Sequence, residues 1–225
     1  MKIAVLGTGI VGQAHAAKLS ELGHDVMVGT HDVPKTLSRT QPDPSGNPPF
    51  SAWIKNHQRV VLMTLADAAA QAGIVIEALN GQAVLDDLTK LQAQLAGKVL
   101  VDVANPLDFS KGRPPTLFVC NDNSLGEQIQ AALPNTKVVK AFNTMNASVQ
   151  TEPQKLAGGI HHLFIAGNDP SAKAQVIEIA SSYGWQNILD LGDIKAARGM
   201  EMLMPIWLEI MATLKTPNFN FNITQ

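Results

Sequence analysis

A glycine-rich motif near the start of the chain has the residue types and spacing to bind a nucleotide. The motif has the pattern GxGxxG and consists of Gly7, Thr8, Gly9, Ile10, Val11 and Gly12. It follows an apolar run and opens a helical pattern. In that context the first glycine permits a tight turn, the second admits backbone N–H groups close to a pyrophosphate, and the third lets helix and strand pack closely. Because a helix N-terminus also favours phosphate, the motif predicts a dinucleotide-binding site.

The residues after the second apolar run favour NADP over NAD. An NAD site usually has a carboxylate at the end of the second strand, where it accepts hydrogen bonds from the ribose. This chain has Thr30 and His31 at that place, with Lys35 close by. These side chains can donate to a 2′-phosphate, which a carboxylate would repel. Asp32 leaves NAD open as an alternative, because a small shift in the turn would bring its carboxylate to the ribose.

Amide side chains follow three of the later apolar runs, at Asn80, Asn105 and Asn143. The carboxyl ends of parallel strands meet at one edge of a sheet, where ligands of such sheets bind. Each asparagine alone is a common turn residue. Together, with no His, Glu or Lys at these positions, they indicate a site without an acid or base catalyst. Such a site suits hydride transfer by alignment of donor and acceptor, so we predict no catalytic side chain.

The other reactive residue types are interpreted as structural. His161 and His162 are adjacent in a predicted strand, so their side chains point to opposite faces and cannot share a metal ion. Lys140 lies inside a strand and is interpreted as an edge or helix-contacting residue, and Cys120 as a packing residue. The only tyrosine, Tyr183, lacks the following lysine of short-chain dehydrogenases, and no GxSxG hydrolase motif occurs. We therefore predict no metal site.

Apolar runs rich in Val and Ile alternate with helical patterns in the first two thirds of the chain. The runs predict strands at residues 2–6, 25–29, 60–64, 74–79, 98–104 and 137–142. The patterns between most of them predict helices at residues 12–22, 65–72, 81–95 and 125–133. This order, with strands apolar on both faces, predicts an α/β fold with a Rossmann-type, doubly wound parallel sheet.

The pattern restarts after about residue 150. It predicts, in order, a strand at 162–166, a helix at 170–183, a strand at 185–191, a long helix from 194, and an edge strand in the tail FNFNI. We therefore expect an NADP-binding domain at 1–150 and a small α/β extension at 151–225, which contributes to the acceptor pocket and a dimer interface. Stretches rich in Pro, Gly and Ser at 41–49 and 108–115 predict loops.

Two apolar rows lie side by side on the long C-terminal helix. The first consists of Met200, Leu203, Trp207, Ile210 and Leu214, and the second of Met204, Leu208 and Met211. One row suffices to pack a helix on its own core. The second row favours a homodimer interface over a helix buried wholly within one chain. Pro205 is expected to kink this helix or to begin a new one.

Length and composition limit the possible classes of protein. A chain of 225 residues can form one main domain with an extension. The net charge of -2 gives no general attraction to nucleic acid, and no stretch approaches the roughly 20 apolar residues of a membrane span. A single cysteine excludes an internal disulfide framework and fits a reducing compartment. We expect a cytoplasmic protein that acts on a small-molecule electron acceptor.

Several segments resemble a known family. They are MKIAVLGTGIVG, VDVANPLDFS, VVKAFNTMNA, FIAGNDPSAKAQV and DLGDIKAARGMEML. They are similar to dinucleotide-binding enzymes typified by deazaflavin-dependent NADP oxidoreductase, and the resemblance covers nearly the whole chain. It implies reversible hydride transfer between NADP(H) and a deazaflavin, in a homodimer. Dehydrogenases of the hydroxyacid or pyrroline-carboxylate type share the N-terminal half but carry a larger, all-helical C-terminal domain.

The resemblance and the motifs together give a set of candidate site residues. The coenzyme is expected at Gly7, Thr8, Gly9, Ile10, Val11, Gly12, Thr30, His31, Lys35, Leu79, Asn80, Asn105, Ala141 and Asn143. The acceptor pocket is expected at Pro106, Phe142 and Met145. His31 stands where family members commonly have an arginine, which weakens the expected grip on phosphate. The acceptor stays open between deazaflavin and FMN or FAD, and a sensor that binds NADP(H) without turnover is the alternative function.

Overall fold

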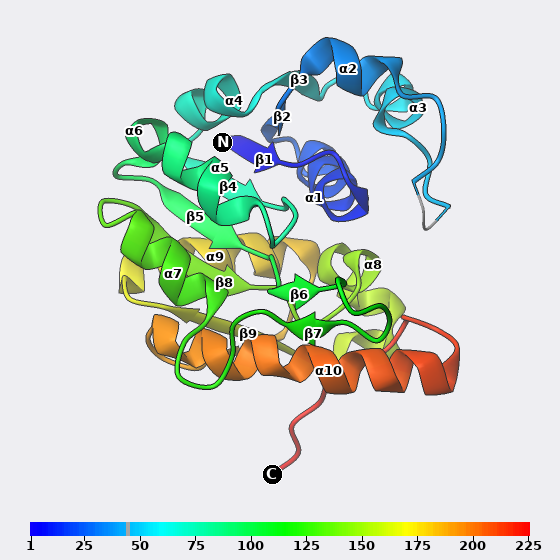
Figure 1. The fold of residues 1–225 in the computed structure, drawn as a ribbon, viewed down its shortest axis with the longest axis vertical. Coiled ribbons are helices and arrows are strands. Elements are labelled where there is room, and N and C mark those ends of the chain that lie inside the picture. Colours follow the sequence, from blue (N-terminus) through cyan, green and yellow to red (C-terminus); the bar gives the residue numbers. More distant parts are fainter. Residues whose placement is uncertain (44–45) are drawn as a thin grey trace.

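The computed structural model describes residues 1–43 and 46–225, with helices on both faces of one central sheet (Figure 1). Its parallel strands are β1 (Lys2–Leu6), β2 (Asp25–Thr30), β3 (Val61–Thr64), β4 (Ile74–Glu77), β5 (Val99–Asp102) and β8 (Lys137–Ala141). They lie in the order β3-β2-β1-β4-β5-β8, so the chain changes direction across the sheet between β1 and β4. The predicted Rossmann-type fold is confirmed, and ligands of such sheets bind at this reversal.

The C-terminal part of the chain adds two strands to the same sheet. β9 (His162–Gly167) pairs antiparallel with β8, and β10 (Asn187–Asp190) pairs parallel with β9. The predicted edge strand in the tail is wrong. That segment is not a strand, and it is held by a backbone bond of 3.0 Å from the His162 N–H to the Phe221 carbonyl and by side-chain bonds from Asn220.

Helices connect the strands on both faces. In the first half they are α1 (Ile10–Glu21), α2 (Val33–Ser38), α3 (Phe50–Trp53), α4 (Leu65–Gln71), α5 (Val84–Lys90), α6 (Gln92–Leu95) and α7 (Leu125–Ala132). In the second half they are α8 (Ala147–Thr151), α9 (Pro170–Tyr183) and α10 (Ala197–Leu214). Short 3₁₀ turns are η1 (Ile54–Asn56), η2 (Pro153–Lys155), η3 (Ala157–Gly159) and η4 (Ile194–Ala196). The single helix predicted over 81–95 is divided into α5 and α6.

The ends of α9 follow from its sequence. The Asp169 carboxylate accepts a hydrogen bond from the Ala172 N–H, and Pro170 takes the first helical position, where its missing N–H costs nothing. Gly184 ends the helix with a φ of 102°, a conformation that glycine adopts without a steric penalty. By contrast, α10 continues through Pro205 as one helix, so the prediction of a new helix there is wrong.

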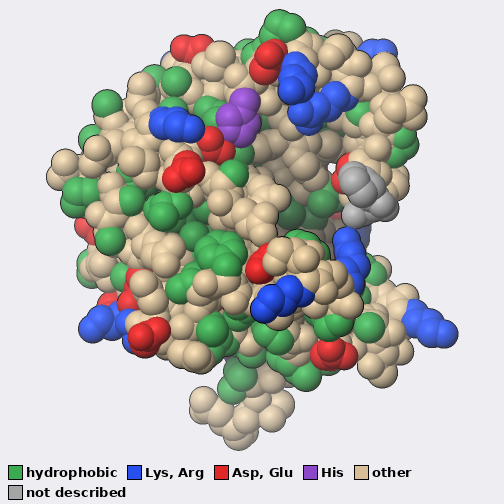
Figure 2. All heavy atoms as spheres, in the orientation of Figure 1, with side chains coloured by type: hydrophobic (Ala, Val, Ile, Leu, Met, Phe, Trp, Pro, Cys, Tyr) green, Lys and Arg blue, Asp and Glu red, His purple; other side chains and the backbone are tan. Residues whose placement is uncertain are grey.

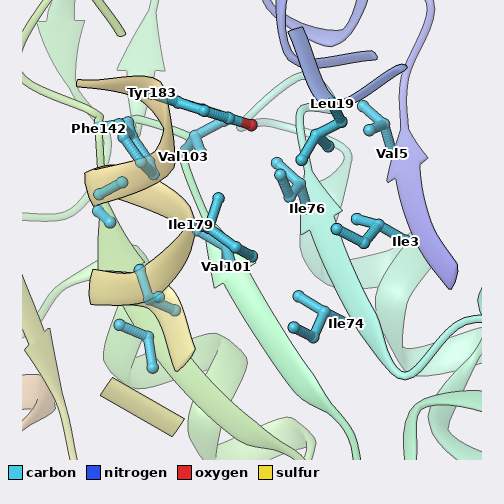
Figure 3. Close-up of a cluster of buried hydrophobic side chains, with 14 of the residues drawn as sticks. Ile3, Val5, Leu19, Ile74, Ile76, Val101, Val103, Phe142, Ile179 and Tyr183 are labelled. Atoms are coloured by element: carbon cyan, nitrogen blue, oxygen red, sulfur yellow. The ribbon is translucent and has the colours of Figure 1, made fainter. Parts of the chain in front are cut away.

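Alternate residues of each strand form two separate cores, one on each face of the sheet. One core holds Ile3, Ile76 and Val101 against α1 and α9, and Figure 3 shows part of it. The other core holds Leu6 and Leu100 against α4, α5 and α7. Among the described residues, no helix is long and apolar enough to cross a membrane.

Loops fill the two stretches predicted to be irregular. Of residues 41–49, Pro44 and Ser45 lie outside the described residues, and the others form no helix or strand. Within 108–115, the chain turns between β6 (Leu107–Asp108) and β7 (Thr116–Leu117), a small antiparallel pair in front of the main sheet (Figure 1). This second loop therefore lies beside the carboxyl ends of β4 and β5.

Candidate functional site

The three glycines of the GxGxxG motif occupy three different environments. Gly7 has a φ of 122°, and a Cβ there would lie 2.4 Å from the Ala78 carbonyl oxygen. A Cβ on Gly12 would lie 2.2 Å from the Gly7 carbonyl oxygen. Among the described residues, a Cβ on Gly9 would meet no atom within 4 Å, and none of their side chains caps the N-terminus of α1 there. Gly7 and Gly12 thus close the turn, while Gly9 leaves space in front of free helix N–H groups, which fits a pyrophosphate.

A cavity of about 290 Å³ lies directly beside this turn, and we call it the turn cavity. Its lining includes Thr8, Gly9 and Ile10 from the motif, and Thr36 and Arg39 from α2 and its C-terminal end. Figure 2 shows a hollow on this face of the molecule with lysine or arginine side chains along part of its rim. Among the described residues, the lining holds one cation, Arg39, and one carboxylate, Asp43, so it is the position of the turn cavity beside the helix N-terminus that suits the phosphates and ribose of a dinucleotide.

The residues after β2 lie near the turn cavity but are partly engaged with one another. The Thr30 hydroxyl is 2.8 Å from the Thr36 hydroxyl, and the His31 Nε2 atom is 2.8 Å from the Asp87 carboxylate. Lys35 is exposed on α2. The Asp32 carboxylate accepts the Lys35 N–H and caps α2.

Arg39 is a candidate that the sequence reasoning missed. It immediately follows α2 and lines the turn cavity together with Gly9 and Thr36. A guanidinium group binds phosphate with paired N–H donors, which the imidazole of His31 cannot do. A whole helix separates Arg39 from β2. Sequence reasoning that considers only the residues directly after that strand therefore does not find it.

A second cavity, of about 230 Å³, lies at the carboxyl ends of β4 and β5, and we call it the strand-end cavity. It is lined by Val11, Ala78, Leu79, Asn80, Gly81, Val103, Ala104, Asn105, Leu107 and Phe109. None of these side chains is ionisable. Because Val11 follows Ile10 in the first turn of α1, this cavity and the turn cavity lie on adjoining sides of the same turn.

Two of the predicted amides are bonded to each other across neighbouring loops. The Asn143 Nδ2 atom donates to the Asn105 Oδ1 atom at 2.9 Å, and the Asn105 Nδ2 atom donates to the Asn143 carbonyl at 2.8 Å. Asn143 also donates to the Met200 carbonyl of α10. The Asn80 side-chain oxygen accepts a hydrogen bond from the Gln82 N–H and so stabilises the turn of its own loop. Asn80 and Asn105 line the strand-end cavity, while Asn143 is buried behind it.

The predicted acceptor pocket is not supported at two of its three side chains. Phe142 has a φ of 62° and is 1% exposed, with its ring against those of His15 and Tyr183. Figure 3 shows it among the core side chains, and Met145 belongs to the same core. Pro106 and Ala141 are buried as well. The left-handed turn at Phe142 sends its side chain into the core, and neither Phe142 nor Met145 lines the strand-end cavity.

Four ionisable side chains lie buried behind the strand-end cavity, and the sequence reasoning missed this cluster. Glu77 and Asp102 end β4 and β5, Lys140 is the last residue but one of β8, and Glu201 comes from α10. The Lys140 ammonium group lies 3.0 Å from Asp102 and 2.8 Å from Glu201. Lys140 contacts a helix as predicted but lies inside the sheet rather than at its edge. We call these residues the ionic cluster.

Burial and neighbouring charges shift the pKa values of two members of this cluster. Burial alone lowers the pKa of Lys140, but the attraction of Asp102 and Glu201 more than offsets it, so its pKa lies above the usual value. Burial and then repulsion by Asp102 raise the pKa of Glu77 well above the usual value. The Glu77 Oε2 atom has no hydrogen-bond partner among the described residues, as fits a neutral carboxyl.

A neutral network occupies the opposite face of the sheet. The His15 ring lies 2.9 Å from the Gln150 Oε1 atom and 3.1 Å from the Tyr183 hydroxyl. Gln150 donates its own amide to the Met145 carbonyl, so its oxygen accepts from His15. Burial lowers the pKa of His15 to about 4, which keeps its ring uncharged at neutral pH. This network joins α1, α8 and α9 without a charge.

The residues predicted to lack chemistry have ordinary structural contacts. The His161 Nδ1 atom contacts the Asn220 amide at 2.8 Å, while the His162 Nδ1 atom contacts Asn222 at 2.9 Å. The two histidines thus bind separate partners in the tail. No group of three or more His, Cys, Asp or Glu side chains in the described part of the chain is arranged to hold a metal ion.

Comparison with known proteins agrees with this geometry. The family profile described as NADP oxidoreductase, coenzyme F420-dependent, matches residues 2–106. A crystal structure from Arthrobacter sp. FB24, of a protein provisionally named an F420-dependent NADP reductase, is 51% identical with full coverage of both chains and a TM-score of 0.96. The F420-dependent NADP reductase of Methanocaldococcus jannaschii is 29% identical over 100% of this chain and 98% of its own length.

A more distant match concerns a part of a larger protein. Metalloreductase STEAP3 of Rattus norvegicus is 29% identical over 92% of this chain but only 38% of its own length. The matches that span whole proteins are therefore those to the reductases. With the fold, the glycine turn and these relatives in agreement, the chain belongs to the family of coenzyme F420-dependent NADP oxidoreductases.

Proposed function

We propose that the protein transfers a hydride between NADP(H) and a deazaflavin of the F420 type. The observation that carries this proposal is the pairing of an open helix N-terminus at Gly9 with an adjoining cavity whose lining has no ionisable side chain. The first feature suits a pyrophosphate, and the second suits a reaction in which the protein moves no proton. The relatives named F420-dependent NADP reductases support the same choice of acceptor.

The coenzyme would extend along the first turn of α1. The N–H groups after Gly9 would bind the pyrophosphate, and Thr30, His31 and Arg39 would hold the 2′-phosphate end in the turn cavity. Leu79, Asn80 and Asn105 would form the wall behind the nicotinamide in the strand-end cavity. When bound, the nicotinamide and the deazaflavin supply the hydride chemistry themselves. The contribution of the chain is alignment and the exclusion of water.

The loop between β6 and β7 would limit access to the acceptor. Phe109 lines the strand-end cavity and is 45% exposed, with the Arg113 guanidinium 5.3 Å from its ring centroid. An exposed aromatic ring at the mouth of an apolar cavity favours a planar partner over water. Pro106 and Leu107 connect this loop to the end of β5. The predicted contact between Pro106 and the acceptor therefore stays part of the proposal.

Steady-state oxidation of NADPH tests this function. The purified protein is mixed with NADPH and, in separate reactions, with deazaflavin, FMN, FAD, a quinone or a ferric chelate. Turnover that is fastest with deazaflavin is the expected result. Turnover only with FMN, FAD or a ferric chelate would replace the acceptor in the proposal. Tight binding of NADPH without turnover of any acceptor would favour a redox sensor instead.

We also propose that α10 mediates a homodimer. Of its two predicted apolar rows, only Met200, Met204 and Trp207 are buried in the chain itself. Met202, Ile206 and Leu214 are between 38% and 54% exposed, and α10 lies along one edge of the molecule (Figure 1). An apolar stripe of this kind commonly marks an interface.

Ile206→Glu tests the dimer, because it puts a charge in the middle of the stripe. We expect light scattering after gel filtration to give a dimeric mass for the wild-type protein and a monomeric mass for the variant. Leu189→Glu is the control, since Leu189 is also exposed but lies on β10. A monomeric wild-type protein, or a dimer that survives Ile206→Glu, would contradict the proposal.

A further inference from the structure

The ionic cluster forms a continuous row across three neighbouring strands. Glu77 of β4 is the register partner of Asp102 of β5, and Asp102 is the register partner of Lys140 of β8. All three side chains are fully buried. They end their strands at the carboxyl edge of the sheet or one residue before it, which is the edge that carries the strand-end cavity. Burying such a row costs free energy unless its members pair with one another or with the backbone.

Two members of the row bind the backbone that forms the cavity wall. The Glu77 carboxyl oxygen accepts the Leu79 N–H, and the Asp102 carboxylate accepts the Ala104 N–H at 2.9 Å. Each bond spans two residues and fixes the direction in which the chain leaves its strand. Leu79 and Ala104 both line the strand-end cavity. The row therefore sets the position of the wall without reaching the cavity itself.

Lys140 connects this wall to the C-terminal helices. Its ammonium group donates to the Ala104 carbonyl at 2.6 Å, to Asp102 at 3.0 Å and to Glu201 at 2.8 Å. Glu201 in turn accepts the N–H groups of Leu125 and Gly126 at the start of α7, at 2.8 and 3.0 Å. One side chain thus uses its three N–H donors on three acceptors, two at the end of β5 and one on α10.

We propose that Lys140 is a positioning residue for hydride transfer: by bridging Asp102, Glu201 and the Ala104 carbonyl, it fixes the cavity wall against which the nicotinamide rests. This inference depends on the proposed function for its kinetic readout. Hydride transfer requires donor and acceptor at a narrow range of distances, and a displacement of about 1 Å can cost about 100-fold in rate. Lys140 lies on β8, which β5 and β4 separate from the glycine turn after β1, so binding at that turn does not require Lys140.

The test compares Lys140→Met with Lys137→Met, a matched control on the same strand. Lys137 lies at the opposite end of β8, and its ammonium group pairs with Asp169 near the surface. For Lys140→Met we expect kcat to fall about 30-fold while the Kd for NADPH changes less than about 3-fold. Lys137→Met is expected to keep both values. A loss shared equally between kcat and NADPH binding would indicate a general structural role and overturn the inference.

Glu201→Gln provides a second variant if Lys140→Met does not fold. The amide oxygen still accepts an N–H group of α7, but the hold on Lys140 is weaker. We expect the same separation of kcat from NADPH affinity, at about 5-fold in kcat. An unchanged kcat in Glu201→Gln would contradict the inference.

Amide hydrogen exchange gives a readout that needs no electron acceptor. The Ala104 N–H group is expected to exchange faster in Lys140→Met or Glu201→Gln than in Lys137→Met, because the Asp102 carboxylate that accepts it is held by Lys140. Equal exchange rates at this amide would overturn the inference. If the wild-type protein turns over no acceptor, the proposed function fails, while the exchange result still decides the role of Lys140.

Discussion

The two parts of the ligand-binding edge of the sheet are built in opposite ways. At the end of β1 the chain exposes main-chain N–H groups beside open space at Gly9 and brings no side-chain charge into the turn itself. At the ends of β4, β5 and β8 the chain buries three ionisable side chains and shows the cavity only neutral groups. The first part is suited to bind an anion, and the second to fix the position of the wall of the strand-end cavity.

This difference separates binding from alignment. A pyrophosphate carries its own charge, so free backbone donors suffice, and any side chain there would obstruct it. A nicotinamide ring has few groups for the protein to bind, so its position depends on the rigidity of the surface behind it. Rigidity in this chain comes from buried ion pairs, which lose much more when one member is removed than an exposed pair does.

Gly9→Asp is the strongest test of the open part of the edge. A Cβ at Gly9 would meet no atom of the described residues within 4 Å, so we expect the fold to be kept while the carboxylate occupies the phosphate position. We expect NADPH affinity to fall about 1,000-fold or more, equivalent to about 4 kcal/mol, in a titration of NADPH fluorescence. Gly73→Asp is the control, because Gly73 also has open space and lies before β4, at the other edge of the sheet. Unchanged NADPH binding in Gly9→Asp would refute the site.

Lys140→Met acts on the buried part of the edge, and we expect it to lower the stability of the fold rather than the affinity for NADPH. Removing one member of a buried ion cluster leaves the Asp102 and Glu201 charges uncompensated. We expect the free energy of unfolding in denaturant to fall by about 3 to 5 kcal/mol. For Lys137→Met, whose pair is partly exposed, about 0.5 kcal/mol is expected. Equal losses in the two variants would show that the ionic cluster is no more important than a surface pair.

The neutral network around His15 extends the comparison to pH. The pKa of His15 is about 4 in the folded chain and 6.5 in the unfolded chain, so the unfolded state takes up the proton first as the pH falls. The stability from His15 is complete above about pH 6.5 and decreases toward pH 4, by about 3 kcal/mol in all. His15→Gln should therefore have a shallower loss of stability over this range in denaturant melts. Parallel pH profiles for the two proteins would contradict the assignment.

Arg39→Ala removes one side chain that lines the turn cavity, and its expected effect is the smallest of these substitutions. We expect the preference for NADPH over NADH to fall about 10-fold, because one charge-assisted contact to the 2′-phosphate is lost. Arg59→Ala serves as a control, since Arg59 lines a different cavity beside α1. Competitive titrations with both coenzymes measure the ratio. A preference that survives Arg39→Ala would assign the 2′-phosphate to Thr30 and His31 alone.

The fold and the glycine turn could be predicted from sequence because their signals are local. Val- and Ile-rich runs mark the strands, and the positions of Gly7, Gly9 and Gly12 follow from the geometry of one turn. The ends of α9 are fixed by Asp169, Pro170 and Gly184, which act on their own neighbours. Even the neutral lining of the strand-end cavity could be read from Asn80 and Asn105.

The rest of the site depends on contacts between distant parts of the chain. The ionic cluster requires the register of three strands and the placing of Glu201 on α10, which no local pattern specifies. Arg39 comes to the turn cavity only through the path of the chain after α2. Phe142 was misplaced because its left-handed φ reverses the direction of its side chain, and such a conformation is rare for an aromatic residue.

The ionic cluster also has a consequence for how the protein is made. The ribosome delivers Glu77 and Asp102 first, Lys140 later and Glu201 near the end of synthesis. Until Lys140 emerges, the Asp102 carboxylate has no cation to accompany it into the interior, so water must keep access to this corner of the growing sheet. The half of the molecule that holds the glycine turn can thus mature on the nascent chain, while the opposite half closes only after translation has reached α10.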